Sequence, residues 1–553
     1  MKYKVLEMAL KPVDWILNWP DKENRYLSGV FAPVHEEVTH DCEVVGVLPE
    51  ALNGTFARNG PNPKFKPKAG YHWFDGDGMV HSVRIKGGKA TYSNRYVRTR
   101  KLKVEEEAGE GLIFNLGDWS SRVAVPKMLL FYLKVKLGIL PDLEAALETN
   151  ANTSLEFHAG RLLALAESGL PYGLRVMCDG VIETIGQATY EGQMNGPFTA
   201  HPKRDPDTGK LYGFGYQISD KSKPYVTYYV LDKSGKLERQ FPIVDIKRPI
   251  MMHDFAITKN YAVFLDFPLM FKPELLLSGK IPVTFDKTQG SRMGILRLDA
   301  VDSSEMQWFD LPQTVYAFHV LNAWEENIEG AGRLGEVAPT VSSAIKIHTC
   351  DFDDLELDIG NLSFPLDQDK MPFLHTVTLN LGTGKATRES ALPSSWPVSE
   401  GVDFPQIRRS LLGRKSRFGY CTVFDSHDLG IAEVKLDLLA ATPDAALVGR
   451  VDHGDGFEGG ECLFIPSKPD NHAGGDSGGE NTFRAQGDEE DDGYLATFVS
   501  RRDGTGNSGK KLRVYDAKTM NSDPVATVKL PSRVPAGFHA IFVTEAEMAI
   551  QQE

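Results

Sequence analysis

Short apolar runs separated by polar turns occupy most of the chain. Typical stretches are 82–97 (SVRIKGGKATYSNRYV), 225–243 (YVTYYVLDKSGKLERQFPI) and 255–267 (FAITKNYAVFLDF). Runs of about five β-branched, aromatic or aliphatic residues, punctuated by Gly, Asp, Asn and Lys, are typical of β-hairpins. Because few stretches between them have helical length, the pattern predicts an all-β protein. Over 553 residues it favours a closed, multi-bladed β architecture over separate sandwiches, and the lack of a strict repeat argues against a WD40-type array.

One segment breaks this pattern with the length of a helix. Residues 125–140 (VPKMLLFYLKVKLGIL) are apolar on almost every side and carry Lys127, Lys134 and Lys136. One interpretation is a buried helix whose lysines extend to the surface. The other is a helix lying in a membrane interface with its lysines at the lipid headgroups. We therefore assign 120–145 as a candidate membrane-contact segment, and the apolar stretch 267–280 is a candidate to join it.

The remaining pattern predicts a single domain over 1–553. Residues 1–25 form an expected N-terminal arm, which lacks the apolar core and cleavage site of a signal peptide. Residues 468–492 (KPDNHAGGDSGGENTFRAQGDEEDD) are Gly-rich, polar and acidic. Such a composition buries little surface, so we expect a flexible surface loop there.

Composition narrows the class of protein. Hydrophobic residues make up 41% and charged residues 25% of the chain, as in a soluble globular protein. The formal charge of −14 argues against a sequence-independent nucleic-acid binder. Five scattered cysteines without CxxC spacing suggest neither a disulfide framework nor a structural zinc site. No apolar run reaches the ~18–20 residues of a spanning helix, so a cytoplasmic monomer is expected.

Four of the 14 histidines have apolar neighbours and an adjacent strand-like run. They are His201, His253, His319 and His539. A single histidine of this kind is more often a satisfied core residue than a metal ligand. Their spacing fits no local zinc motif such as HExxH, but it suits a radial fold in which separate blades each send one residue to a common axis.

Several longer motifs resemble those of the carotenoid cleavage oxygenases. The motifs are ARNGPNPKF (57–65), YHWFDGDGMVHSVRI (71–85), TAHPK (199–203), MMHDFAIT (251–258), FHVLNAWEE (318–326) and VPAGFHAIFV (534–543). The similarity runs from about Tyr26 to Val543. It is strongest to the cytosolic plant-type dioxygenases that act at the 9,10 and 9′,10′ bonds. Several motifs in the right order are far more specific than any single one.

The resemblance implies a seven-bladed β-propeller with an axial iron site, capped by a dome of loops and helices. Four axial histidines hold Fe(II) in this family, and by position they match the four histidines above. Three carboxylates that accept hydrogen bonds from such histidines match Glu167, Asp403 and Glu461. Many relatives have Glu at the middle position. Because Asp403 is one methylene shorter, we expect its contact with the imidazole to be longer or shared with water.

This set of residues suits the implied chemistry. Neutral imidazoles favour a borderline metal such as Fe(II), and carboxylates on the far ring nitrogens fix the tautomer. Four ligands leave two positions for O2 and substrate. Thr153 matches a threonine whose methyl group crowds one of them, although a strand threonine is equally compatible with the sequence. The resemblance therefore implies oxidative cleavage of a conjugated double bond in a carotenoid or apocarotenoid, with peripheral membrane contact and no obligatory acid–base residue.

Other functions remain open at this point. Stilbene cleavage uses the same fold and iron, with a Tyr and a Lys that engage the phenolic hydroxyl. A catalytically silent propeller that serves as a binding scaffold is a third hypothesis, and retinoid isomerisation is a remote fourth. GDSGG (475–479) copies a serine-protease motif, but it lies in the polar loop without the other parts of a triad. FDGDG (74–78) lacks the later ligands of a calcium loop.

Overall fold

The computed structural model describes residues 12–13, 24–67, 70–113, 115–120, 124–138, 149–218, 223–278, 280–329, 341–357, 370–425, 430–468, 489–502 and 510–551. Strands dominate these ranges, which confirms the all-β prediction. The α-helices discussed below are α2 (Arg100–Ala108), α3 (Ala124–Lys136) and α5 (Glu545–Ala549). The 3-10 helices that bear on the site are η1 (Arg25–Leu27), η5 (Leu116–Ser120), η6 (Pro273–Ser278) and η10 (Arg409–Leu411).

Most strands form four-stranded antiparallel sheets, and the described residues contain five separate sheets of this kind. They consist of β5 (Ser154–His158), β6 (Arg161–Leu165), β7 (Tyr172–Val176) and β8 (Ile182–Gln187); β9 (Lys203–Arg204), β10 (Leu211–Tyr216), β11 (Val226–Leu231) and β12 (Leu237–Pro242); β13 (Ala256–Ile257), β14 (Tyr261–Asp266), β17 (Arg292–Arg297) and β18 (Gln307–Asp310); β19 (Tyr316–Glu329), β20 (Val341–Phe352), β21 (Phe373–Asn380) and β22 (Lys385–Ser390); and β23 (Glu400–Gln406), β24 (Phe418–Asp425), β25 (Ala432–Asp437) and β26 (Leu447–Asp452). A small pair, β15 (Leu269–Phe271) and β16 (Val283–Phe285), stands apart.

The other strands form one ten-stranded sheet. It contains β1 (Thr39–Gly46), β2 (Gly54–Pro61), β3 (Gly78–Lys86), β4 (Lys89–Tyr96), β27 (Phe457–Glu458), β28 (Leu463–Pro466), β29 (Gly493–Arg501), β30 (Lys511–Asp516), β31 (Ala526–Lys529) and β32 (Ala540–Thr544). The first half of β1 pairs with β4 and its second half with β31. The expectation of seven separate blades is therefore corrected to five separate blades and one larger sheet, because β1 joins strands from both ends of the chain.

The hairpins predicted from the apolar pattern form where expected. The turn between β3 and β4 is the clearest, because Lys86 pairs with Lys89 across only two residues. These residues, Gly87 and Gly88, have φ of +56° and +75°. Two positive φ values define the turn that matches the twist of a two-residue hairpin, and glycine adopts them without a steric penalty.

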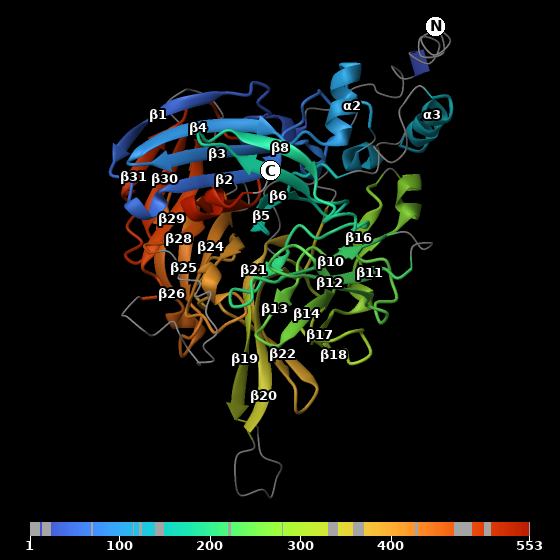
Figure 1. Ribbon diagram of the computed structural model, residues 1–553. Helices are drawn as coiled ribbons and strands as arrows, with labels where there is room; N and C mark the ends of the chain where they lie inside the picture. Colours follow the sequence, from blue (N-terminus) through green and yellow to red (C-terminus); the bar gives the residue numbers. More distant parts are fainter. Residues whose placement is uncertain are drawn as a thin grey trace, which may run out of the picture.

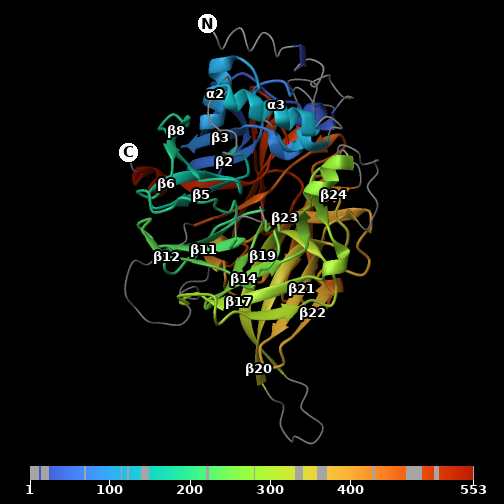
Figure 2. The same ribbon diagram turned by 90° about the vertical axis from the view of Figure 1, so that its right-hand side faces the viewer.

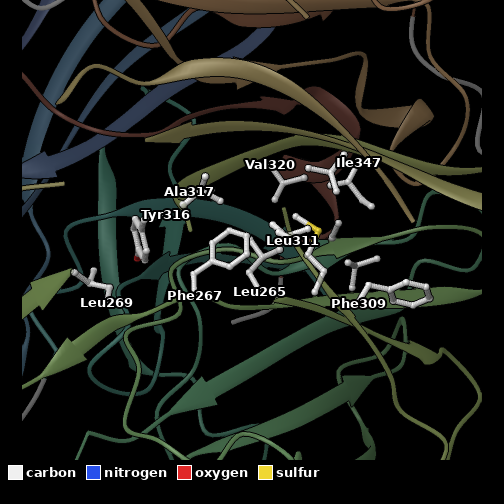
Figure 3. Packing of buried hydrophobic residues seen from close by; sticks show 14 of the residues in the cluster. Leu265, Phe267, Leu269, Phe309, Leu311, Tyr316, Ala317, Val320 and Ile347 are labelled. Atoms are coloured by element: carbon white, nitrogen blue, oxygen red, sulfur yellow. The ribbon is translucent and has the colours of Figure 1, made fainter. Parts of the chain in front are cut away.

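The core lies between neighbouring sheets. The largest apolar cluster joins the β13–β14–β17–β18 sheet to the β19–β22 sheet, and Figure 3 shows Leu265 and Phe267 of the first facing Val320 and Ile347 of the second. Burial of each such side chain contributes roughly 1.5–3 kcal/mol. Packing of sheet against sheet around a centre therefore fixes the inner strands that carry the site.

Helices α2 and α3 lie at the opposite end of the molecule from the β19–β20 hairpin, as Figures 1 and 2 show. Among the described residues, every helix is too short or too polar to cross a bilayer.

Helix α3 exposes apolar side chains and buries a lysine, which is the reverse of the usual pattern in a soluble protein. Leu129, Tyr132 and Leu133 are 61%, 45% and 44% exposed, whereas Lys127 is buried. Its Nζ lies 3.3 Å from the Asp118 carboxylate. The expectation that this lysine reaches lipid headgroups is therefore wrong, because the buried ammonium pairs with the half-buried carboxylate of Asp118 in η5.

Helix α3 also contacts η6, so the two apolar stretches singled out in the sequence lie together.

Several expected segments fall largely outside the described residues. These are most of the arm 1–25, residues 121–123 and 139–145 of the membrane-contact segment, and 469–488 of the acidic loop. The described end of that loop is anchored. Asp491 pairs with the buried Lys435, and the Glu490 carboxylate accepts hydrogen bonds from the backbone N–H groups of Arg417 and Phe418.

Candidate metal centre

The four histidines singled out in the sequence meet at one point. One ligand nitrogen from each of His201, His253, His319 and His539 lies within 4.8 Å of the others. Each histidine lies within β19 or one to three residues before β9, β13 or β32. The Nε2 atoms of His201 and His253 are 3.0 Å apart, and those of His319 and His539 are 3.1 Å apart.

Irregular backbone aims these side chains. The β19–β20 pairing shifts register on both sides of His319. A β-bulge adds a residue to one strand and redirects the side chains beside it. Backbone hydrogen bonds from His539 N to Thr153 O and from Asn59 N to His539 O fix the segment before β32.

Three carboxylates approach the outer nitrogens of three of the histidines. The Nδ1 atom of His253 contacts Glu167, that of His319 lies 2.7 Å from Asp403, and that of His539 lies 2.8 Å from Glu461. These are the pairings that the carboxylate positions suggest. An imidazole that donates from Nδ1 to a carboxylate keeps its Nε2 lone pair free for a metal.

The contact of Asp403 corrects one expectation. We expected its shorter side chain to give a longer or water-shared contact, but the contact is direct and as short as that of Glu461. An irregular backbone brings the shorter Asp403 side chain within direct reach of the His319 ring. The β23–β24 register shifts between Asp403 and Gln406, and Phe404 has φ of +50°, a conformation that is strained for a non-glycine residue.

Further residues that the sequence analysis missed hold the carboxylates. The Tyr216 hydroxyl donates to Glu167, and the Gln406 amide donates to Glu461 over 2.7 Å. The backbone N–H of Phe404 donates to Asp403 over 2.8 Å. The positions of Tyr216 and Gln406 carry no signal in one sequence, because each contact joins strands far apart in the chain.

Asp254 was also missed, and it links three histidine segments. It follows His253 and is 1% exposed. Its carboxylate accepts a hydrogen bond from Val320 N, next to His319, over 2.8 Å and lies 2.7 Å from Lys203 Nζ, two residues after His201. The acid beside a histidine in MMHDF is the signal that would have revealed it.

Burial sets the charge state of the cluster. It holds the pKa of His201 and His319 well below the usual value, and neighbouring histidines lower both further. Burial alone would also lower the pKa of His253, but the charge and hydrogen bond of Glu167 outweigh it and raise that pKa. Burial raises the pKa of Asp403 to about 7. His201 and His319 are therefore neutral at pH 7, which is the form that binds a metal.

The donor set fits a metal ion. Two nitrogens that each lie about 2.1 Å from one metal at right angles are about 3.0 Å apart, close to the two Nε2 separations given above. Three of the rings have Nδ1 beside a carboxylate, and in the tautomer with the proton on Nδ1 their Nε2 lone pairs converge. Converging lone pairs repel one another, and a cation removes that repulsion. All-imidazole coordination suits iron, copper, nickel or zinc rather than magnesium or calcium.

A cavity of about 400 Å³ reaches the cluster. Its walls are mainly aromatic and aliphatic, including Trp73, Phe318, Phe404 and Phe538. His253, His319 and His539 line it, together with Thr153, Glu167 and Asp403. The sequence-predicted Thr153 therefore shares a cavity with three of the histidines. We call this space the apolar cavity.

A second cavity, of about 190 Å³, meets the cluster from another side. His201 lines this cavity and not the apolar one, whereas His253 lines only the apolar one. Its walls include Glu156, Lys203 and Asp254. We call it the polar chamber.

Comparisons with known proteins identify the family. The family profile described as retinal pigment epithelial membrane protein (RPE65) matches residues 31–544. A carotenoid 9,10(9′,10′)-cleavage dioxygenase 1 of Phaseolus vulgaris is 40% identical over 561 residues, covering 99% of this chain and 94% of that protein. The chain belongs to the carotenoid cleavage oxygenase family. The relatives named as carotenoid cleavage dioxygenases are oxidoreductases, and the protein is an enzyme of that class.

Other relatives agree with this membership. The carotenoid 9,10(9′,10′)-cleavage dioxygenase 1 of Arabidopsis thaliana is 39% identical over 562 residues, covering 99% of this chain and 95% of that protein. Among solved structures, a Pseudomonas brassicacearum lignostilbene dioxygenase has a TM-score of 0.73 at 24% identity and covers 95% of this chain and 99% of its own. Cobalt-substituted Synechocystis ACO has a TM-score of 0.68 at 23% identity and covers 96% and 99%. These structures share the propeller-like fold of this member of the family.

Proposed function

We propose that the protein is a non-haem Fe(II) dioxygenase that cleaves conjugated double bonds of carotenoids or apocarotenoids, at the 9,10 and 9′,10′ positions, into aldehyde and ketone products. One observation carries the proposal. Four convergent histidines, three with a carboxylate on Nδ1, lie at the wall of a mainly aromatic cavity. The relatives named as 9,10(9′,10′)-cleavage dioxygenases support the choice of bond.

Each residue then has a defined part. His201, His253, His319 and His539 hold the iron, which when bound supplies the site that activates O2. Glu167, Asp403 and Glu461 orient three of the rings and keep their Nε2 atoms unprotonated. Aromatic walls exclude water and align the polyene, and Thr153 restricts the space beside the cluster.

The same proposal puts the iron on the axis of the propeller-like fold. Segments of the five separate blades and of the ten-stranded sheet, in or beside β5, β9, β13, β19, β23, β28 and β32, line the polar chamber. Inner strands that share one axial space are the expected arrangement of a propeller.

We also propose that α3 rests on a membrane surface. A carotenoid resides in a bilayer, and α3 exposes Leu129, Tyr132 and Leu133 next to the exposed Lys136. An apolar helix face bordered by lysine suits the interface of an anionic bilayer. The enzyme would then work as a monomer at a cytoplasmic membrane surface, where its five free cysteines stay reduced.

The apolar cavity also supports a second candidate function, the cleavage of hydroxylated stilbenes. Tyr26 and Lys370 both line it. A tyrosine and a lysine are the residue types expected to engage a phenolic hydroxyl. The fold shared with a lignostilbene dioxygenase is compatible with this alternative.

One assay separates the two candidates. Purified protein is incubated with a C40 carotenoid in detergent and with a 4-hydroxystilbene, and the products are identified by mass. We expect a C13 ketone and a dialdehyde from the carotenoid, and neither product from the His319→Ala variant. Turnover of the stilbene with the carotenoid left intact would replace the proposal with the alternative.

A further inference from the structure

The polar chamber contains a buried hydroxyl without a protein partner. Ser410 of η10 lines the chamber and is 7% exposed, and its Oγ has no hydrogen-bond partner among the described residues. A buried polar atom beside a polar cavity of this size is satisfied by water. The chamber is therefore a hydrated space that touches His201, His319 and His539.

An ion pair stands where the chamber meets the surface. The Arg409 side chain is 41% exposed and pairs with Glu156, whose side chain is 8% exposed. Arg204 lies on the other side of the same carboxylate, with Nε 3.5 Å from Oε1. Because Arg409 is anchored mainly by this one pair, its long side chain is free to swing outward.

The two cavities present very different barriers to a metal ion. A dication that entered through the apolar cavity would lose most of its water against mainly aromatic and aliphatic walls, among which stand carboxylates such as Glu356 and Asp425. An unpaired ion in apolar surroundings costs tens of kcal/mol. In the chamber, water replaces lost hydration, and an entering ion competes with Arg409, Arg204 and Lys203 for the carboxylate oxygens of Glu156 and Asp254. The barrier to entry of a metal ion is therefore lower on the hydrated side of the cluster.

We propose that ferrous ion reaches the four histidines, and leaves them, through the polar chamber, with Arg409 as the gate and Glu156 as a transient oxygen ligand behind it. The inference rests on the proposed iron site and concerns only the route to it. The apolar cavity is then reserved for the polyene, so iron and substrate approach the cluster from different sides.

The test measures iron release from the loaded full-length protein. Excess ferrous chelator is added without oxygen, the rate of release is followed by absorbance, and affinity is measured separately by competition. A route alters both directions equally, so affinity stays constant while the rate changes. We expect Ser410→Leu, which narrows the chamber, to slow release about tenfold and Arg409→Ala, which opens the gate, to speed it by a similar factor.

A matched control narrows the other cavity. Leu355 lines the apolar cavity, and Leu355→Trp should leave the release rate unchanged. Slower release in Leu355→Trp together with unchanged release in Ser410→Leu would overturn the route. If Ser410→Leu does not fold, the surface variant Arg409→Ala decides, and an unchanged rate there also overturns the proposal. Protein that binds no iron would instead refute the proposed function.

Discussion

The two cavities that meet at the histidine cluster differ in almost every physical property. The apolar cavity is the larger, and its walls are mainly rings and aliphatic chains. The polar chamber has about half the volume and is bordered by ion pairs that include Lys203–Asp254 and Arg409–Glu156. His319 and His539 line both spaces.

This difference shows how one fold separates two incompatible requirements. A polyene needs a dry apolar space, whereas a buried metal needs charged and hydrogen-bonded supports around its ligands. The cluster forms the boundary between the two spaces. Asp254 lines the polar chamber, and its contacts with Val320 and Lys203 hold the segments of His319 and His201. His319 also lines the apolar cavity.

The largest effect should come from removing a histidine, which tests whether the histidines of both cavities bind one metal ion. His201 faces only the polar chamber and His253 only the apolar cavity. If one ion joins them, His201→Ala and His253→Ala should lose iron and activity equally, by more than the about 10- to 100-fold typical of outer partners. Metal analysis and carotenoid turnover measure this, with His375→Ala, outside the cluster, as control. Full iron content in either cluster variant would show that His201 and His253 do not bind the same ion.

Removing an outer partner should have a smaller effect. Glu461→Gln leaves the ring of His539 in place but weakens its orientation, so turnover should fall about 10- to 100-fold. Tyr216→Phe acts one layer further out, through Glu167, and should reduce iron affinity and turnover by less. Circular dichroism checks the fold and competition with a chelator measures the affinity. A Tyr216→Phe loss that exceeded the Glu461→Gln loss would reverse this order.

Cleavage of a carotenoid in the apolar cavity should depend on membrane binding, whereas the iron content should not. Changing Leu129, Tyr132 and Leu133 to Ser removes the exposed apolar face of α3, so we expect weaker liposome binding and several-fold slower cleavage of membrane-borne carotenoid. Cleavage of a short, detergent-dispersed apocarotenoid and iron content should stay constant. Val47→Ser/Val301→Ser, at exposed positions outside α3, is the control. A folded triple variant with undiminished liposome binding would contradict the assignment.

The smallest effect concerns stability in acid. His158 is the last residue of β5, and among the described residues its buried ring nitrogens make no hydrogen bond to another side chain. Burial lowers its pKa to about 4. In the unfolded chain His158 binds a proton near pH 6.5, whereas in the folded protein it stays neutral until about pH 4. The unfolding free energy is therefore highest above pH 6.5 and falls as the pH decreases toward 4. Between pH 8 and 5 the loss is on the order of 2 kcal/mol.

Urea unfolding at several pH values measures this slope. His158→Phe should flatten the fall in unfolding free energy between pH 7 and 5. An equally steep fall in the variant would assign the acid sensitivity to other groups.

The sequence predicted local structure, and which histidines come together, better than it predicted the arrangement of the sheets. Paired apolar runs with glycine turns identified hairpins such as β3–β4, because both partners are adjacent in the chain. The motifs around the four histidines, together with the family resemblance, pointed to one site. The blade count differed, because pairing of β1 with β4 and β31 joins distant segments. Lys127 was misplaced, because its partner Asp118 lies on another element, η5, and the pair forms only when α3 packs against it.

Distant contacts also explain the residues that were missed. Tyr216, Gln406 and Asp254 act on groups in other strands, and a single sequence does not show which strands will meet. The direct contact of Asp403 depends on a bulge and on the positive φ of Phe404. Backbone irregularity of this kind leaves no mark in an apolar pattern.

The iron content of the active protein tests the central claim most directly. Protein purified without oxygen is loaded with increasing amounts of Fe(II), and bound iron and carotenoid cleavage are measured on the same samples. We predict that activity rises in proportion to occupancy and levels off at about one iron per chain. Full cleavage without bound iron, or a plateau at another stoichiometry, would contradict a single iron held between the two cavities.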